Sequence, residues 1–317
     1  MTTLYLHIGT HKTGSTATQN YLYQHRDELI SRGILYPSAG LEGTAHHRLC
    51  WACGQGDHTA DPGLVISACQ SIAAEAEQAE ADVILSSEEF EYLQDLEHLE
   101  VLQEYFDVKV VLYVRKQDHY LESKYNQQVR SYRTRYSGSI YQFLTTFNFY
   151  VQFNYNLVAQ RWENVFGQEN LIVRPYGTSL VHEDGPEDLL SVAGALPITE
   201  KQGRPVIIDG NFSMSAQAIP YLSHINQVSL SHQQHHNLIA LLQKRVPRDG
   251  AASLLRREDA SDFYDKFGPS NTKFFSRYLG MESNPFDELL PADAEKVWVD
   301  HEKVDIRQLL GMLDHVL

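Results

Sequence analysis

The sequence predicts an α/β protein in three layers, with a central parallel β-sheet covered by helices on both faces. Two short apolar runs, Val83–Ser87 and Lys109–Val114, are rich in β-branched residues, which is typical of strands buried on both faces. Segments with helical spacing stand between such runs and after them. Strands that alternate with helices in this way predict a parallel sheet built from crossover connections.

The N-terminal elements follow one another closely. Thr3–Ile8 is predicted to be the first strand, Gly9–Gly14 a loop, and Ser15–Arg32 a helix that ends at Gly33. Ile34–Tyr36 is a short β-rich run. In order, the pattern then predicts a loop from Pro37 to about residue 63, a helix over Ala68–Ala81, the strand Val83–Ser87, a helix over Glu91–Tyr105 and the strand Lys109–Val114.

The rest of the chain is predicted to be mainly helical. The pattern predicts a helix over 118–131, one or two helices over 140–166 that end at Gly167, a strand over Asn170–Val173 closed by Pro175, a loop over 200–213, and helices over 186–194, 232–246, 271–279 and 301–316. No linker is long enough to separate a second domain. We therefore expect a single domain over 1–317, with a core over 1–180 and a helical C-terminal cap over 181–317.

The charge distribution excludes one class of partner and favours another. The 317 residues include 41 acids and 26 bases, a formal net charge of −15, whereas nucleic-acid binding needs clustered Lys and Arg. Between Arg48 and Lys109 there are fourteen acids and no Lys or Arg. From Lys109 to Arg135 there are seven bases and two acids. An anionic ligand is therefore expected to bind near this basic stretch.

Hydropathy and the cysteines bear on the compartment. No apolar run approaches the ~18 residues of a membrane span, and residues 1 to 8 lack the layout of a signal peptide. Cys50, Cys53 and Cys69 are an odd number within one region, which fits a reducing compartment better than a disulfide framework. These observations predict a cytoplasmic protein without a membrane span.

The loop after the first strand is the strongest functional motif. Gly9 and Gly14 are separated by four residues and followed by Ser15 and Thr16, which resembles a P-loop. Glycines let such a backbone fold around oxyanions, and the N–H groups at the helix start favour negative charge. Ser15 or Thr16 is expected to cap the helix. The lysine of this loop, Lys12, lies inside it instead of next to the hydroxyl residue, so the pair that holds magnesium in nucleoside triphosphatases is missing.

The segment IGTHKTGSTATQ resembles the sulfotransferases that use 3′-phosphoadenosine 5′-phosphosulfate (PAPS), in particular their bacterial branch. The resemblance implies a P-loop-like fold and a nucleotide-binding core over 1–180. It also implies that Lys12 contacts the bridging and sulfuryl oxygens of the donor, while Thr13, Gly14, Ser15 and Thr16 supply backbone and hydroxyl donors. Cytosolic relatives often have a tryptophan where this chain has Ala17, so the adenine platform must lie elsewhere.

A second motif follows the strand Lys109–Val114. Arg115 stands at the end of this strand and Ser123 eight positions later, as in the 3′-phosphate site of the resembled family. An arginine there presents a forked donor, and a serine two turns into the next helix can reach the same phosphate. Taken alone, this spacing also fits an ordinary solvated helix start.

A base for the acceptor is expected at the end of the strand Val83–Ser87, because ligands collect at the carboxyl ends of parallel strands. Glu88 stands there, with Glu89 as the alternative, and carbohydrate sulfotransferases resemble this arrangement with a strand-terminal glutamate as base. The ordinary alternative is a helix start, in which Ser86 or Ser87 is the N-cap and the acids lie in the first turn.

The loop after the second predicted strand offers two further candidates. His46 or His47 could orient or deprotonate the acceptor. His47, Cys50, Cys53 and His58 are also spaced like zinc ligands, although buried cysteines and surface histidines are the more common outcome.

Together these motifs predict a PAPS-dependent sulfotransferase with catalytic residues Lys12, Glu88 and His47. The acceptor is expected to be a hydroxyl on a saccharide or small metabolite, and no metal is expected. A nucleotide-dependent kinase and a nucleotide-binding module without chemistry are the alternatives. A kinase would need magnesium and a lysine next to Ser15.

Overall fold

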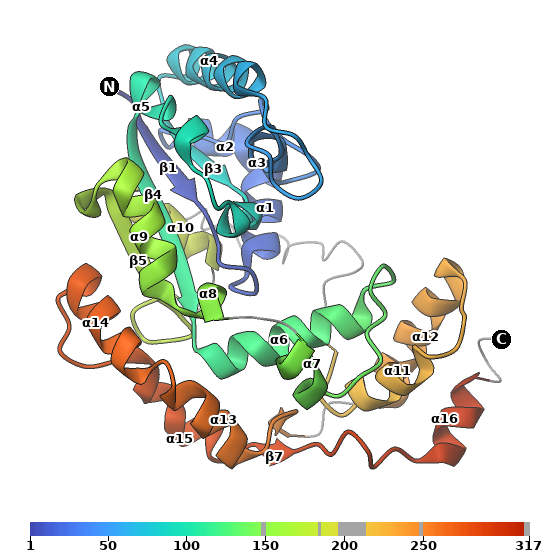
Figure 1. Cartoon of the computed structure of the whole chain (residues 1–317). Coiled ribbons are helices and arrows are strands. Elements are labelled where there is room, and N and C mark those ends of the chain that lie inside the picture. Colours follow the sequence, from blue (N-terminus) through green and yellow to red (C-terminus); the bar gives the residue numbers. More distant parts are fainter. Residues whose placement is uncertain (147–149, 183–184, 196–213, 247–249, 314–317) are drawn as a thin grey trace. The chain divides into compact units, whose positions relative to one another are not determined.

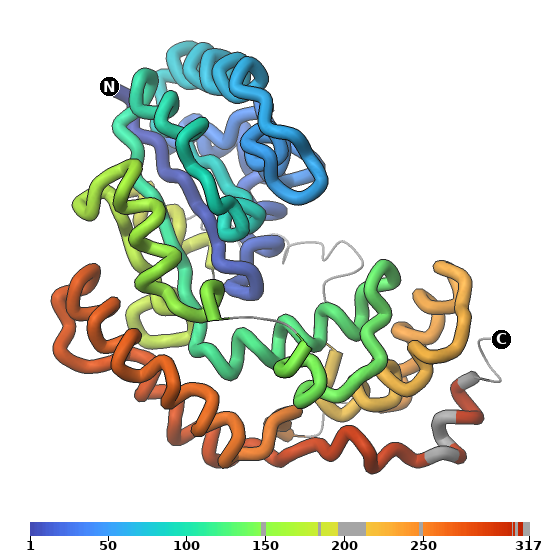
Figure 2. Tube along the Cα trace, in the orientation of Figure 1, coloured from blue at the N-terminus to red at the C-terminus, as the bar shows by residue number. Residues whose placement is uncertain are grey.

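The structure is a computed structural model that describes residues 1–146, 150–182, 185–195, 214–246 and 250–313 (Figure 1). The chain forms two compact units. The first contains Met1–Arg115, Asn154–Asp209 and Ser270–Pro285, and the second contains Lys116–Phe153, Gly210–Pro269 and Phe286–Leu317. Figure 2 shows the course of the backbone through these segments. The expected single domain stays a prediction.

The first unit contains a five-stranded parallel sheet, so the predicted α/β class with a central parallel sheet is confirmed. The strands are β1 (Thr3–His7), β2 (Ile34–Leu35), β3 (Asp82–Ser86), β4 (Asp107–Arg115) and β5 (Leu171–Tyr176), in the order β2-β3-β1-β4-β5. Central strand β1 pairs His7 with Ser86 of β3 and with Val111 of β4. Pro175 lacks an N–H donor and is tolerated because β5 is an edge strand.

The order in which strands are added to the sheet reverses its direction at β1. The chain leaves β1 towards β2, and later leaves β3 towards β4 on the other side of β1. Right-handed crossovers place the connecting helices of opposite directions on opposite faces of the sheet. Ligands of open α/β sheets bind in the crevice that such a reversal leaves at the carboxyl ends. The residues that follow β1, β3 and β4 are therefore positioned for function.

Helices flank the sheet of the first unit. One group packs in a shared core with residues of β2, β3 and β4 and consists of α1 (Ser15–Gln24), α2 (Arg26–Ile30) and α10 (Gly185–Val192). The other helices of this unit are α3 (His47–Ala52), α4 (Pro62–Ala79), α5 (Leu102–Tyr105), α9 (Tyr155–Phe166) and α14 (Gly268–Leu279), with 3₁₀ turns η1 (Glu88–Tyr92), η2 (Glu97–Leu99) and η3 (Gln168–Asn170). Leu22, Ile84 and Leu189 are fully buried in the shared core.

Several predicted helices of the first unit have different bounds. The helix predicted over Ser15–Arg32 is interrupted at His25, which separates α1 from α2. Helix α4 begins at Pro62, six residues before the predicted start, because the Asp61 side chain caps the N–H of Leu64 at 3.1 Å. Helix α3 lies inside the predicted loop.

The predicted helix over Glu91–Tyr105 is wrong in kind. The segment forms η1, η2 and only one short α-helix, α5. Its buried apolar side chains are spaced by three: Phe90, Leu93, Leu96, Leu99 and Leu102. Three residues per turn is the repeat of a 3₁₀-helix, so this spacing aligns the side chains on one side of tight turns and not on one face of an α-helix.

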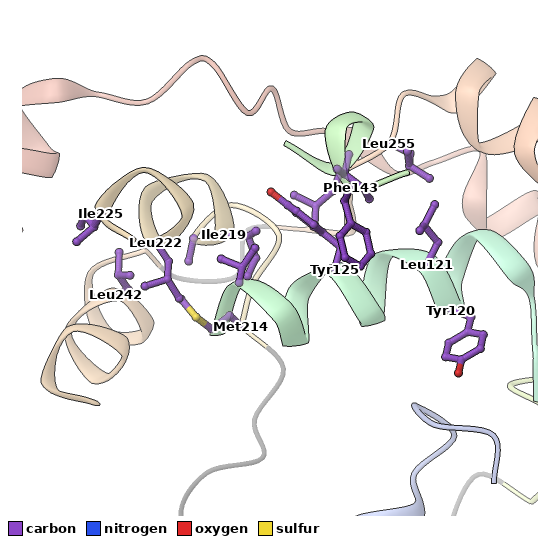
Figure 3. Close-up of a cluster of buried hydrophobic side chains, with 14 of the residues drawn as sticks. Tyr120, Leu121, Tyr125, Phe143, Met214, Ile219, Leu222, Ile225, Leu242 and Leu255 are labelled. Atoms are coloured by element: carbon purple, nitrogen blue, oxygen red, sulfur yellow. The ribbon is translucent and has the colours of Figure 1, made fainter. Parts of the chain in front are cut away.

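The second unit is mainly helical and has its own core (Figure 3). Its elements are α6 (Gln117–Arg130), α7 (Ile140–Thr146), α8 (Tyr150–Phe153), α11 (Ile219–Ile225), α12 (His232–Arg245), α13 (Arg257–Asp265), α15 (Leu290–Asp293), α16 (Ile306–Leu313) and the short parallel pair β6 (Ala252–Ser253) and β7 (Val297–Trp298), with the 3₁₀ turn η4 (Pro285–Leu289) before α15. Tyr125 of α6, Phe143 of α7 and Leu222 of α11 are buried together.

The later predictions are mostly confirmed. Helices were expected where α6, α9, α10, α12, α14 and α16 occur, and α9 ends at Gly167 as expected. The described residues of 140–166 form α7, α8 and α9, where one or two helices were expected, and α11, α13 and the β6–β7 pair were not predicted. The loop expected over 200–213 and residues 314–316 lie outside the described residues. No described helix has the length and hydrophobicity needed to span a membrane.

Candidate functional site

The loop after β1 is held tightly against the sheet. Thr10 donates its N–H to the carbonyl of Tyr113 at 2.6 Å, and Tyr113 donates to the carbonyl of Gly9 at 2.7 Å. Gly9 has φ 84°, and a Cβ there would lie 3.2 Å from the Cα of Glu88. Only glycine fits both restrictions. The backbone of Glu88 therefore packs directly against the loop at Gly9.

Helix α1 opens with backbone N–H groups that have no acceptor in the described part of the chain. Gly14, with φ 84°, is the N-cap residue and no side chain caps the helix, so the expected cap by Ser15 or Thr16 is wrong: both residues already lie inside the helix. Among the described residues, none accepts a hydrogen bond from the N–H groups of Thr13, Gly14, Ser15 or Thr16. Four such N–H groups at the positive end of a helix form a site for an anion.

Two of the predicted cationic residues come together at this edge. The guanidinium of Arg115, at the end of β4, donates to the carbonyl of Lys12 at 2.6 Å. The same guanidinium lies 5.7 Å from the ring centre of Tyr176, at the end of β5. Arg115 therefore joins the ends of β1, β4 and β5. Ser123 lies in α6 of the second unit, so its pairing with Arg115 stays a prediction.

A pocket of about 560 Å³ follows β5 in the first unit. It is lined by Tyr176, Gly177, Thr178, Ser179, Val181 and His182. A Cβ placed on Gly14 would lie 3.7 Å from the Tyr176 ring. Tyr176 therefore borders both the loop after β1 and this pocket.

Glu88 is an ionised carboxylate at the end of β3. Gln19 of α1 donates to its Oε2 at 2.6 Å. Burial, the largest influence, acts to raise the pKa of Glu88, but nearby His11, the Gln19 hydrogen bond and His47 act against it, and the pKa lies below its ordinary value. The carboxylate is thus available as a proton acceptor at neutral pH. Ser87 is the N-cap of η1, as the ordinary alternative proposed, and accepts from the N–H of Glu89 at 3.2 Å.

His47 contacts Ser87, the residue before Glu88, and its hydrogen bonds favour a ring that donates through Nε2. Ser87 Oγ accepts from Glu89 N–H and from Cys50 Sγ–H, the latter at 3.3 Å. A hydroxyl has two acceptor positions and one proton, so that proton points to Nδ1 of His47, 2.8 Å away. The neutral imidazole then carries its own proton on Nε2. In this form His47 is suited to orient an acceptor and not to deprotonate it.

His46 has a structural role. Its Nδ1 accepts from the N–H of Ser86 at 3.2 Å, and its Nε2 lies 3.0 Å from the carbonyl of Pro37. Burial lowers the pKa of His46 to about 4, so the ring is neutral. Both nitrogens are therefore occupied, and His46 fixes the loop before α3.

The zinc alternative fails on geometry. No three of His47, Cys50, Cys53 and His58 bring ligand atoms within 4.8 Å of one another. The three cysteines are free and buried, and burial raises the pKa of Cys53 to about 12. The exposed His58 ring stacks on Trp51 at 4.9 Å. The common outcome, buried cysteines and a surface histidine, is what the structure has.

Three polar residues of this edge were missed by sequence reasoning. His11 lies in the loop, and its ring Nδ1 is 2.7 Å from Oε2 of Glu91 in η1. Gln19, in α1, holds Glu88. Glu91 fell inside a predicted helix eighty positions away, so no spacing rule connected it with His11. The only available signal was the position of His11 between the two glycines of the loop.

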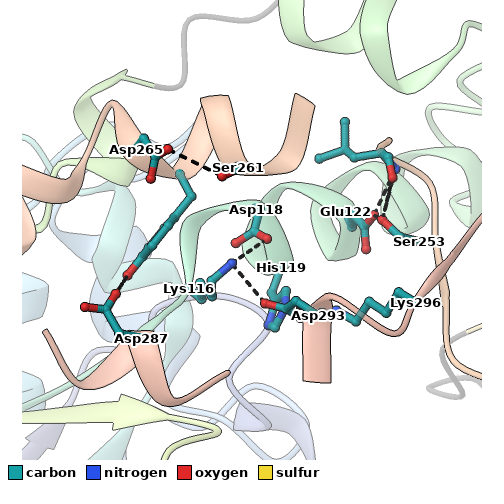
Figure 4. Close-up of polar contacts among 12 residues, drawn as sticks. Lys116, Asp118, His119, Glu122, Ser253, Ser261, Asp265, Asp287, Asp293 and Lys296 are labelled. Atoms are coloured by element: carbon teal, nitrogen blue, oxygen red, sulfur yellow. Dashed lines mark hydrogen bonds and ion pairs between the residues drawn. The ribbon is translucent and has the colours of Figure 1, made fainter. Parts of the chain in front are cut away.

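A second polar cluster lies in the second unit (Figure 4). Asp118, His119 and Asp293 bring ligand atoms within 4.8 Å of one another, beside a pocket of about 290 Å³. Lys116 Nζ is 2.7 Å from Asp118 and 3.0 Å from Asp293, and Lys296 Nζ is 2.7 Å from Asp293. The two ammonium groups therefore occupy the place that a cation would take.

No family model matches the chain, and no solved structure matches it. The chain is similar to an uncharacterized protein of Archaeoglobus fulgidus, with 29% identity over 178 residues. The match covers 55% of this chain and 47% of the archaeal protein, so it spans about half the length of that relative.

Proposed function

We propose that this chain is a PAPS-dependent sulfotransferase that transfers a sulfuryl group to a hydroxyl of a saccharide or small metabolite. The observation that carries the proposal is the anion-binding loop before α1 with the ionised Glu88 directly beside it. An anion-binding element and a base in contact are the two parts that sulfuryl transfer to a hydroxyl requires. The resemblance of IGTHKTGSTATQ to bacterial sulfotransferases supports the same activity.

The donor is assigned to the loop and to the end of β4. The N–H groups of Thr13, Gly14, Ser15 and Thr16 bind the phosphosulfate, and Lys12 neutralises charge on the departing phosphate. The N–H groups are fixed before the ligand arrives, so little reorganisation opposes binding.

The 3′-phosphate and the nucleoside complete the donor assignment. Arg115 is assigned to the 3′-phosphate, and the contact of Ser123 with the same phosphate stays what the resemblance implies. We assign the nucleoside to the pocket after β5, because Tyr176 borders it and offers an aromatic face.

The acceptor is assigned to the side of Glu88 and His47. As the acceptor oxygen forms its bond to sulfur, the bond between sulfur and the bridging oxygen breaks, and its electron pair stays with adenosine 3′,5′-bisphosphate. Glu88 takes the acceptor proton, and His47 orients the hydroxyl through Nε2–H. The fourteen acids between Arg48 and Lys109 disfavour a strongly anionic polysaccharide as acceptor.

The decisive experiment incubates the full chain with radiolabelled PAPS and a panel of saccharides and hydroxylated metabolites, with EDTA present. We expect labelled product with at least one acceptor, and no product with Lys12→Ala at matched time. Lys296→Met, in the second cluster, is the matched lysine control and should keep activity. Phosphoryl transfer from ATP that needs magnesium would favour a kinase, and nucleotide binding without any transfer would favour the module without chemistry.

A further inference from the structure

The His11–Glu91 pair lies in the proposed donor site, beside the residues assigned to sulfuryl transfer. Glu91 Oε2 is 2.7 Å from Nδ1 of His11 and also accepts the backbone N–H of His11 at 2.9 Å. The Glu91 side chain is fully buried, and the His11 side chain is 11% exposed. A buried carboxylate that binds one loop residue twice fixes both the ring and the backbone of that residue.

The contact also fixes the tautomer of His11. A carboxylate oxygen that accepts a backbone N–H is an acceptor, so the proton of the ring contact lies on Nδ1 of His11. This leaves Nε2 as the nitrogen that can meet a ligand. Among the described residues, none forms a hydrogen bond with Nε2, and the ring lies at a tilt of 36° against the ring of Tyr92, with 4.4 Å between the two ring centres.

Charged groups of both signs surround His11. Glu91 is in contact, and Glu88 is near enough that His11 acts to lower the Glu88 pKa. The nearby cations are Lys12, the next residue in the loop, and Arg161, whose guanidinium donates to the carbonyls of Glu91 and Leu93. An anion bound to the loop would place further negative charge beside the ring.

We propose that His11 is a further catalytic residue, which donates a hydrogen bond from protonated Nε2 to the sulfuryl oxygens and the bridging oxygen as negative charge develops there. Glu91 is a positioning residue that sets the tautomer and the orientation of the ring. The inference rests on the proposed function and adds no bond change to it: the acceptor proton still goes to Glu88, and the electron pair still goes to the leaving phosphate. His11 and Lys12 then stabilise the same departing charge from adjacent loop positions.

The test uses His11→Asn in the full chain, because the amide NH₂ can replace Nδ1–H towards Glu91 while Nε2 is removed. We expect kcat to fall by ~10²- to 10³-fold, and the affinity for adenosine 3′,5′-bisphosphate, which keeps the bridging oxygen, to fall as it does in Lys12→Ala. In His11→Asn, the fall of kcat on the alkaline side of neutral pH, the alkaline limb, should disappear. In Glu88→Gln, the fall of kcat on the acid side, the acid limb, should disappear instead. His236→Asn, an exposed histidine of α12, is the control and should keep both limbs.

Glu91→Gln gives the readout for the positioning role. Loss of the negative neighbour should move the alkaline limb to lower pH and lower kcat less than His11→Asn does. Thermal unfolding checks every variant, and His11→Ala replaces His11→Asn if the latter does not fold. Unchanged kcat and an unchanged alkaline limb in the folded His11 variant would overturn the role of His11 while leaving sulfotransfer intact. Absence of sulfuryl transfer by the wild-type protein would overturn the proposed function itself, and His11 with it.

Discussion

The loop after β1 and the cluster around Asp293 both contain titratable side chains. They differ in how many of their polar groups have a partner within the protein. In the cluster, two carboxylates face two ammonium groups, so the charges cancel. At the loop, four backbone N–H groups and Nε2 of His11 find no acceptor or donor among the described residues. The comparison indicates that a dense set of charges marks a stable packing contact, whereas oriented groups without a protein partner mark a place for a ligand.

The largest expected effect is the loss of turnover in Glu88→Gln. This variant tests whether Glu88, and not another candidate residue, is the base. Glu88→Gln keeps the size of the side chain and its contact with Gln19 but removes the proton acceptor. We expect kcat to fall by ~10²- to 10⁴-fold, with nucleotide affinity nearly unchanged. Steady-state kinetics of Glu88→Gln, Glu89→Gln and His47→Ala in one assay decide among the candidates. A collapse in Glu89→Gln with normal turnover in Glu88→Gln would move the base.

Lys12 tests the loop itself. Lys12→Ala should lower kcat by ~10²- to 10³-fold, because it removes a charge that is set in place before the reaction. The rate of labelled sulfate transfer at saturating donor measures this effect. Turnover close to wild type would show that the loop binds the donor without stabilising the departing phosphate.

Arg115 tests the donor side through binding alone. Arg115→Ala should weaken adenosine 3′,5′-bisphosphate by about 2 to 4 kcal/mol, as expected for a charge-assisted forked contact. Adenosine 5′-monophosphate, which lacks the 3′-phosphate, should lose much less. Isothermal calorimetry with both ligands gives the difference, and equal losses would contradict the assignment of Arg115 to the 3′-phosphate.

The second cluster should respond in stability and not in activity. Lys296→Met removes the ammonium group that contacts Asp293 and His119, and we expect a loss of about 1 to 3 kcal/mol in the free energy of unfolding. Urea unfolding measures this loss. A fall in sulfate transfer with unchanged stability would mean that the cluster is a functional site after all.

The smallest effect is the pH dependence of Asp293. Burial acts most strongly, raising its pKa, but His119, Lys296 and Lys116 outweigh burial and hold the pKa of Asp293 well below its ordinary value. The contribution of a carboxyl with a depressed pKa is present above the pKa of the unfolded chain and is lost as the pH falls towards the folded value. Asp293→Asn should therefore flatten the acid limb of stability against pH. Unchanged acid unfolding would contradict the pairing.

The parts of the fold that could be predicted are those whose signal is local. The strand Lys109–Val114 is a mainly apolar run with three valines, and Gly9 and Gly14 identify the loop because a backbone turn restricts residue choice at those positions. The prediction of one helix over Glu91–Tyr105 is wrong because a spacing of three resembles helical spacing over a short segment.

The candidate site could be predicted only in part, for a related reason. Glu88 follows a predicted strand, so a rule about strand ends finds it. The partner of His11 is Glu91, which the sheet brings close through the pairing of β1 with β3. A contact between residues eighty positions apart depends on the strand order. The strand order cannot be predicted from the sequence of either segment alone.

The most direct test of the account is calorimetric binding of adenosine 3′,5′-bisphosphate to the wild-type chain, Lys12→Ala, Arg115→Ala and Lys296→Met, in EDTA. We expect one bound ligand per chain, weaker binding in the Lys12 and Arg115 variants, and wild-type binding in the Lys296 variant. Absence of binding to the wild-type chain, or equal weakening in all three variants, would contradict the claim that the uncommitted groups of the loop form the donor site.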